Sequence, residues 1–149
     1  MNSRGEVVGI NTAILLESQG IGFAINIDDA RTVAEQLMSR GYVERGFMGF
    51  SPIDLTSAII SQTGLELPEE VIEGILVYSV TRRYPAHKAG LMRGDVIVEM
   101  GGQPIMNTGK LSKFLIDHLP GEIVEVTFYR GMRRLTTEVT LAEQLEDVR

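Results

Sequence analysis

The chain has 149 residues, a formal net charge of −6, no cysteine and 44% hydrophobic residues. This hydrophobic share is that of a soluble globular protein. No apolar run approaches the roughly 18 residues of a membrane span, so we expect no direct membrane insertion by this segment. The lack of cysteine excludes disulfides and thiolate metal sites. An acidic chain without clustered basic residues also argues against nucleic acid as a partner.

The N-terminal part of the chain predicts two strands followed by a helix. Residues 6–11 and 20–25 have the pattern of strands. Asn26 or Asp28 can cap the helix that follows, and Gly41 ends it. The helix has one apolar face, which consists of Ala30, Val33, Ala34, Leu37 and Met38. Two strands alone are marginal in water, so we expect them to belong to a larger sheet whose other strands are absent.

The pattern changes near residues 41–45, and the rest of the chain is rich in strands. The expected helices cover 55–62, 86–91 and 108–119. The expected strands cover 75–80, 95–100, 123–129 and 134–141, and the last two read as a hairpin. The predicted fold class is therefore mainly β with helices (α+β): a partly open antiparallel barrel capped by helices.

The sequence does not contain the residue patterns that catalysis or metal binding requires. Serine catalysis requires a serine, a histidine and a carboxylate together, and no Gly-x-Ser-x-Gly occurs. The histidines are His87 and His118, which lie in separate predicted helices. A zinc site would need about three ligands. We therefore expect no catalytic residue, no metal and no cofactor in this chain.

The segment 46–50, Gly-Phe-Met-Gly-Phe, carries the functional signal. Glycines let a backbone turn sharply and direct successive N–H groups into one concavity, which can bind a carboxylate. An apolar strand after such a loop could pair with an extended peptide. The alternative is a glycine-bearing edge strand in the barrel wall, and spacing alone does not decide between the two.

Longer motifs in the second part of the chain resemble those of a known family. Residues 86–97 contain the pattern Ala-Gly-Leu-x-x-Gly-Asp-x-Ile, preceded by Gly-Ile-Leu-Val at 74–77 and followed by Gly-Gly-Gln-Pro-Ile at 101–105. Together these runs resemble a PDZ domain, and the match covers nearly all of residues 45–142. The segment 45–50 resembles the carboxylate-binding loop in PDZ domains of HtrA-type serine proteases. Residues 54–73 match least.

The N-terminal part resembles the same proteases. Residues 2–13 are similar to the stretch just after their catalytic serine, and residues 21–25 to the end of their protease domain. The resemblance places residues 22–24 near the wall of the substrate S1 pocket. The resemblance also places Asn11, Thr12 and Ala13 near this wall. The triad itself is absent, so catalysis does not carry over to these residues.

The resemblance implies a domain plan and a parent protein. Residues 1–27 would be a remnant of a trypsin-like protease domain, 28–44 a connecting helix, 45–142 a PDZ domain and 143–149 a charged tail. The parent would be an extracytoplasmic serine endopeptidase. Whether it forms homo-oligomers is left open. The chain shows no signal pattern, so it is either cytosolic or a fragment lacking its true N-terminus.

The expected ligand is a C-terminal or unfolded peptide. Its carboxylate would accept hydrogen bonds from the loop Phe47, Met48, Gly49 and Phe50, aided by Arg45. The groove would be lined by Ser51 and Ile53 on the strand and by Ser112 and Ile116 on the long helix. A wider helical stripe is expected in the core, made of Leu111, Phe114, Leu115 and Leu119.

The leading function is a PDZ module of an HtrA-like endopeptidase. It would capture C-termini or exposed apolar segments for regulation or substrate recruitment. A stand-alone PDZ adaptor with no protease activity is the alternative. A PDZ domain of a tail-specific or intramembrane protease is a third possibility, against which residues 3–41 argue. No constellation supports an independent hydrolase.

Overall fold

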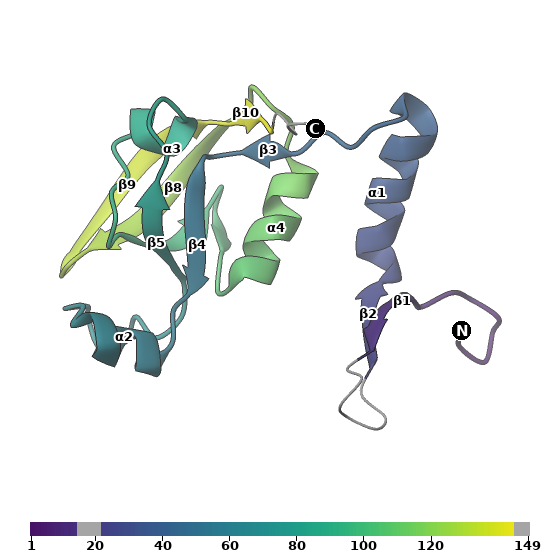
Figure 1. The fold of residues 1–149 in the computed structure, drawn as a ribbon, viewed down its shortest axis with the longest axis horizontal. Coiled ribbons are helices and arrows are strands. Elements are labelled where there is room, and N and C mark those ends of the chain that lie inside the picture. The colour runs from purple at the N-terminus through teal and green to yellow at the C-terminus, as the bar shows by residue number, and fades with distance from the viewer. Residues whose placement is uncertain (15–21, 145–149) are drawn as a thin grey trace. The chain divides into compact units, whose positions relative to one another are not determined.

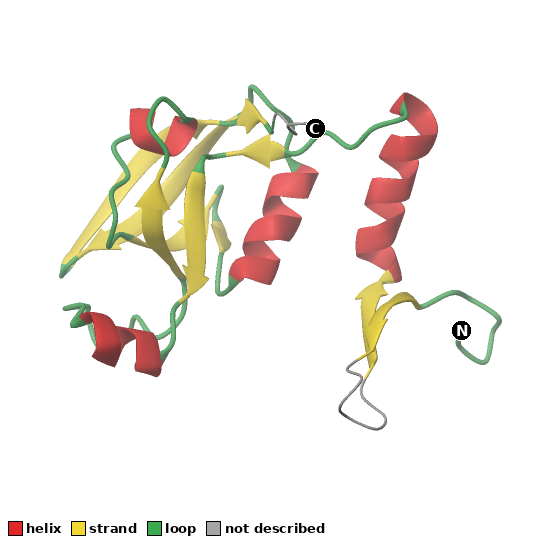
Figure 2. Cartoon of the chain, viewed as in Figure 1, coloured by secondary structure: helices red, strands yellow, loops and turns green. Residues whose placement is uncertain are grey.

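The computed structural model describes residues 1–14 and 22–144. The chain divides into two compact units, Met1–Val43 and Glu44–Arg149. We describe each unit by itself (Figures 1 and 2). None of the described helices is long and apolar enough to cross a membrane.

The first unit is a hairpin followed by a helix. Strands β1 (Gly9–Ile14) and β2 (Gly22–Asn26) pair antiparallel. Strand β1 begins later than predicted, and the predicted start of the second strand, residues 20–21, lies outside the described residues. Helix α1 (Ile27–Arg40) starts at Asn26, whose side chain accepts a hydrogen bond from the N–H of Asp28. Gly41 ends the helix in a left-handed conformation and donates its N–H to Leu37. Of the two predicted N-caps, Asn26 and Asp28, the structure has Asn26, and Gly41 ends the helix as predicted.

In the first unit, none of residues 1–12 and 22–43 is buried. Large apolar side chains lie open on both strands, with Phe23 53% and Ile25 47% exposed. The predicted apolar face of α1 likewise has no buried member, since Leu37 and Met38 are exposed. Residues 1–12 and 22–43 therefore form regular secondary structure without building a hydrophobic core.

The second unit is built on an open antiparallel sheet with strand order β4-β5-β6-β8-β9, to which β7 adds by pairing with β6. A separate short pair joins β3 to β10. The strands are β3 (Gly46–Phe47), β4 (Phe50–Asp54), β5 (Ile75–Val80), β6 (Val96–Met100), β7 (Gln103–Pro104), β8 (Ile123–Arg130), β9 (Arg133–Thr140) and β10 (Ala142–Glu143). The helices are α2 (Ser57–Thr63), α3 (Pro85–Lys88) and α4 (Thr108–Asp117). The predicted α+β class is confirmed, and the sheet stays open.

Two hydrophobic clusters hold this unit together. The main core gathers residues of the sheet, of α4 and of the loop after β3, including Met48, Ile97, Phe114 and Val126. The second cluster joins β4 to β6 with the chain around α2: its buried members are Leu55, Val71, Leu76 and Val96. Residues 54–73, the least matched part of the sequence, thus contribute to a core of their own.

Several predicted boundaries differ from the structure, and two of them bear on the site described below. Helix α4 ends at Asp117, because His118 takes up an extended conformation and caps it. Glu143, which was assigned to the charged tail, belongs to the domain, since it forms β10 with Ala142 against β3. The rest of the predicted tail, residues 145–149, lies outside the described residues.

A buried ion pair fixes the turn that leads into β6. Asp95 is 1% exposed, and Arg130 of β8 donates to both of its carboxylate oxygens at 2.8 Å and to the Gly90 carbonyl at 2.8 Å. The Met92 N–H donates to the same carboxylate at 2.8 Å. The hydrogen bond to Asp95 raises the pKa of Arg130 above its usual value, although burial opposes this. Arg130 therefore stays charged at ordinary pH.

Candidate peptide-binding site

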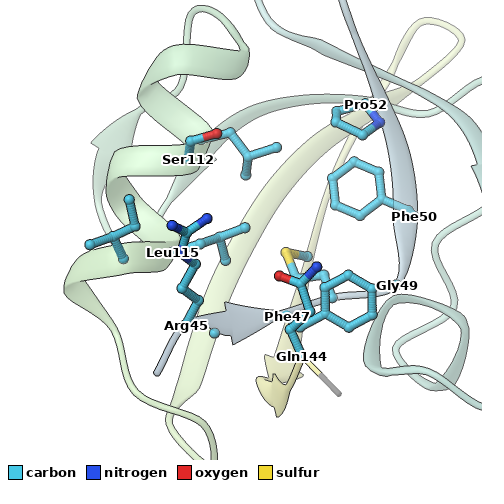
Figure 3. A pocket seen from close by; sticks show the side chains of 12 residues that line it. Arg45, Phe47, Gly49, Phe50, Pro52, Ser112, Leu115 and Gln144 are labelled. Atoms are coloured by element: carbon cyan, nitrogen blue, oxygen red, sulfur yellow. The ribbon is translucent and has the colours of Figure 1, made fainter. Parts of the chain in front are cut away.

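A pocket of about 200 Å³ lies between β4, α4 and the loop after β3. Its lining residues are Arg45, Gly46, Phe47, Met48, Gly49, Phe50, Pro52, Leu111, Ser112, Leu115, Ile116 and Gln144. In Figure 3, Ser112 and Leu115 stand on the helix side and face Phe50 and Pro52 on the strand side. The pockets that hold drug-sized ligands usually span about 300–1,000 Å³. This one suits a side chain rather than a whole small molecule.

The loop between β3 and β4 turns its N–H groups away from the sheet. The Met48 carbonyl accepts a hydrogen bond from Ala86 at 2.8 Å, and the Gly49 carbonyl accepts one from Thr81 at 2.9 Å. Within the described parts of the chain, no carbonyl accepts from the N–H of Met48 or Gly49. Both residues are buried and line the pocket. Two neighbouring donors without partners at a concave site form a nest for an anion.

Gly49 is required by this geometry for two reasons. Its φ is +77°, a conformation that L side chains rarely adopt. A Cβ built on Gly49 would also lie 2.2 Å from the Cβ of Tyr84. Tyr84 in turn packs edge-on against Phe47, with ring centroids 5.3 Å apart. A side chain at position 49 would therefore disturb the whole loop.

The other end of the loop is held by the end of α4. The Gly46 N–H donates to the carbonyl of His118 at 3.1 Å. The His118 ring stacks on Phe114 with centroids 3.9 Å apart, and its Nδ1 lies 2.7 Å from the Phe114 carbonyl. His118 therefore has a structural role that ties the loop to the helix. His87, in α3, is exposed.

The helix wall is broader than the sequence pattern suggested. Ser112 and Ile116 line the pocket, and so do Leu111 and Leu115. Leu111 is buried and Leu115 is half-buried, so these two serve the core and the pocket together. Leu119 was expected in the core, but this is wrong: it is 38% exposed, because the helix ends before it.

The strand wall has the opposite phase from the one expected. Phe50 and Pro52 line the pocket, whereas Ser51 and Ile53 do not. The Ser51 hydroxyl accepts a hydrogen bond from Ser79 of β5 at 2.9 Å, and Ile53 packs on the second cluster. The assignment of Ser51 and Ile53 is therefore corrected, because successive side chains point to opposite faces of a strand.

Two further residues at the pocket were not found from sequence. Pro52 lies in β4 between Ser51 and Ile53. Assigning the opposite face of the strand to the groove would have identified it. Gln144 follows β10 and reaches the pocket only because β10 pairs with β3. No local pattern marks it. Arg45, which was predicted, is exposed and lines the pocket.

The residues assigned to a protease pocket lie in the first unit. Asn11, Thr12 and Ala13 belong to β1, where the pairing register shifts between Asn11 and Ala13. The Thr12 hydroxyl donates to the Phe23 carbonyl at 3.2 Å. Among the described residues, no group of three or more His, Cys, Asp or Glu side chains could hold a metal ion.

Comparison with known proteins agrees with this geometry. A family model described as a PDZ domain matches residues 46–141. The serine protease Do-like HtrA of Lactococcus lactis is 31% identical over 99% of this chain and 38% of its own length. The periplasmic pH-dependent serine endoprotease DegQ of Escherichia coli is 35% identical over 95% of this chain and 31% of its own length. The chain thus spans about a third of the length of these relatives.

Solved structures show the same likeness. The HtrA-type protease AlgW with a tripeptide has a TM-score of 0.75 and 30% identity, and it covers 95% of this chain and 47% of its own. The same protease with a decapeptide has a TM-score of 0.74 and 29% identity over 95% of this chain and 43% of its own. The chain belongs to the PDZ domain family, in the form that HtrA-type serine proteases carry.

Proposed function

We propose that residues 44–144 capture the C-terminal end of polypeptides for an HtrA-type serine endopeptidase. The observation that carries this is a pocket with apolar walls in which no carbonyl of residues 1–14 or 22–144 accepts from the N–H of Met48 or Gly49. A terminal carboxylate would bind these donors. Arg45, which also lines the pocket, adds a positive charge. The apolar walls would take the last side chain.

The setting of the site supports the same proposal. Relatives that are similar over almost the whole chain are named serine proteases, and DegQ is named periplasmic. We extend this to a parent endopeptidase outside the cytoplasm, in which Asn11, Thr12 and Ala13 would form part of the substrate-pocket wall. This chain by itself would bind peptide and not cleave it.

The test is a titration of fluorescent peptides that end in an apolar residue, with free or amidated C-termini. Hydrogen bonds to a charged group contribute about 1.5–3 kcal/mol each. Loss of one such bond should weaken binding by roughly tenfold or more. Equal affinity for the free and the amidated peptide would rule out carboxylate capture.

A matched pair of variants places the site. Gly49→Val should lose binding of the free peptide because it combines backbone strain with the contact to Tyr84. Gly102→Val is the control: Gly102 has the same φ of +77° but nothing within 4 Å of its added Cβ. It lies away from the pocket and should bind peptide as the unmodified chain does. Unchanged binding by a folded Gly49→Val variant would contradict the proposed site.

A further inference from the structure

Pro52 occupies an unusual place for a strand that is to receive a peptide. Strand β4 is at the edge of the large sheet, next to β5 on one side only. Pro52 lies in the middle of β4 and lines the pocket. A peptide that binds by adding a strand to this edge must find hydrogen-bonding groups along it.

The direction of the main-chain groups of β4 follows from its bonds to β5. The Gly49 carbonyl accepts from Thr81, just after β5, and the Leu55 N–H donates to Gly74, just before β5. Main-chain groups alternate between the two edges of a strand. The residues between these anchors that turn their N–H and carbonyl groups to the free edge are therefore Phe50, Pro52 and Asp54. The pairing register shifts between Ser51 and Pro52, but the extra residue lies on β5, so the alternation along β4 is kept.

Proline has no N–H, so the free edge lacks a donor at its central position. A peptide with its carboxylate in the loop would place its last residue beside Phe50. An antiparallel ladder engages every second residue, so the third residue from the end would lie beside Pro52. Its N–H can donate to the Pro52 carbonyl, but its own carbonyl finds no donor there.

The groove also closes just beyond this point. The Asp54 carboxylate accepts a hydrogen bond from the N–H of Thr108, the first residue of α4, at 2.6 Å. The last residue of β4 and the start of the helix are thereby joined. A peptide that continues between strand and helix would have to displace this hydrogen bond or turn out to solvent.

We infer that Pro52 ends the peptide ladder in this groove, so that the third residue from the end of a bound polypeptide finds no main-chain donor for its carbonyl. The inference rests on the proposed function and names its ligand more closely. Residues upstream of the third contribute little to affinity.

The first test is peptide length. Peptides of three, five and eight residues that share the same C-terminal sequence are titrated against the full chain, each with an amidated control. We expect the three free peptides to bind within about twofold of one another. A steady gain in affinity with length, with the amidated controls still weak, would overturn the inference and leave the proposed function standing. Equal binding of free and amidated peptides would overturn the function itself.

The second test restores the missing donor. Pro52→Ala should tighten binding of all three peptides about two- to tenfold, the range of one added neutral hydrogen bond. Ser51→Ala is the matched control, because the Ser51 side chain points to Ser79 and away from the pocket. It should leave affinity unchanged. A folded Pro52→Ala variant with unchanged affinity would contradict the role of Pro52.

A change in the ligand tests the same point without any variant. The amide that follows the third residue from the end is replaced by an ester, which weakens its carbonyl as an acceptor. The unmodified protein should bind the ester and the amide within about twofold, because that carbonyl has no donor at Pro52. A roughly tenfold loss would show that a donor reaches it and would overturn the inference.

Discussion

The ion pair between Arg130 and Asp95 contributes to the stability of this domain. Asp95 is almost fully buried, and its carboxylate is bonded by Arg130 and by the Met92 N–H. Removing Arg130 leaves a buried charge with too few partners. We predict that Arg130→Ala lowers the free energy of unfolding by about 3 kcal/mol, as measured by urea denaturation.

Arg134→Ala is the control for this prediction. The Arg134 guanidinium lies 3.9 Å from the Glu99 carboxylate, and the Arg134 side chain is largely exposed. This pair should therefore contribute less than about 1 kcal/mol to the free energy of unfolding. Because the pKa of Arg130 is raised in the folded state, its contribution is present below the unfolded pKa and disappears only at strongly alkaline pH. Equal losses of unfolding free energy in the two variants would show that the pair with Asp95 contributes no more than the exposed pair.

At the scale of elements, the hairpin β1–β2 is the weak part of the chain. Its strands pair only with each other within the described residues, and their apolar side chains are exposed. An isolated two-stranded hairpin is marginally stable in water. We predict that amides of β2, such as that of Ile25, exchange almost as fast as in an unfolded chain, whereas Val77 of β5 is strongly protected.

Hydrogen exchange followed by mass spectrometry checks this, with the hairpin β8–β9 as an internal reference. Strong protection of β2 at every protein concentration would contradict the prediction and show a stable hairpin. Protection that rises with concentration would show that the exposed edges pair between copies instead.

At the scale of the whole molecule, we predict that this chain does not cleave protein. Its sequence lacks a nucleophile motif, and His118 is engaged in stacking on Phe114. Purified chain should leave unfolded casein intact and should not react with an active-serine probe. Cleavage that persists through repurification and matches probe labelling would contradict the prediction, with an HtrA-type protease as the positive control.

The sequence by itself determined much of the local structure and the family. Caps such as Asn26 and Gly41, and the pattern Ala-Gly-Leu-x-x-Gly-Asp-x-Ile, depend on neighbouring residues alone. The glycines at 46–50 likewise predict a sharp backbone turn, and Gly49 has a φ of +77° there, whereas its close approach to Tyr84 has no local signal. The α+β class and the HtrA-type PDZ resemblance, both read from these patterns, are confirmed.

Only the tertiary structure decided which side chains form the pocket. The alternation along β4 is compatible with either phase, and contacts across the sheet put Phe50 and Pro52 at the pocket in place of Ser51 and Ile53. Ties between distant residues, Arg130 to Asp95 and Asp54 to Thr108, leave no local pattern. Such contacts depend on how elements pack, and a change of one residue in phase turns a strand's side chains to its other face.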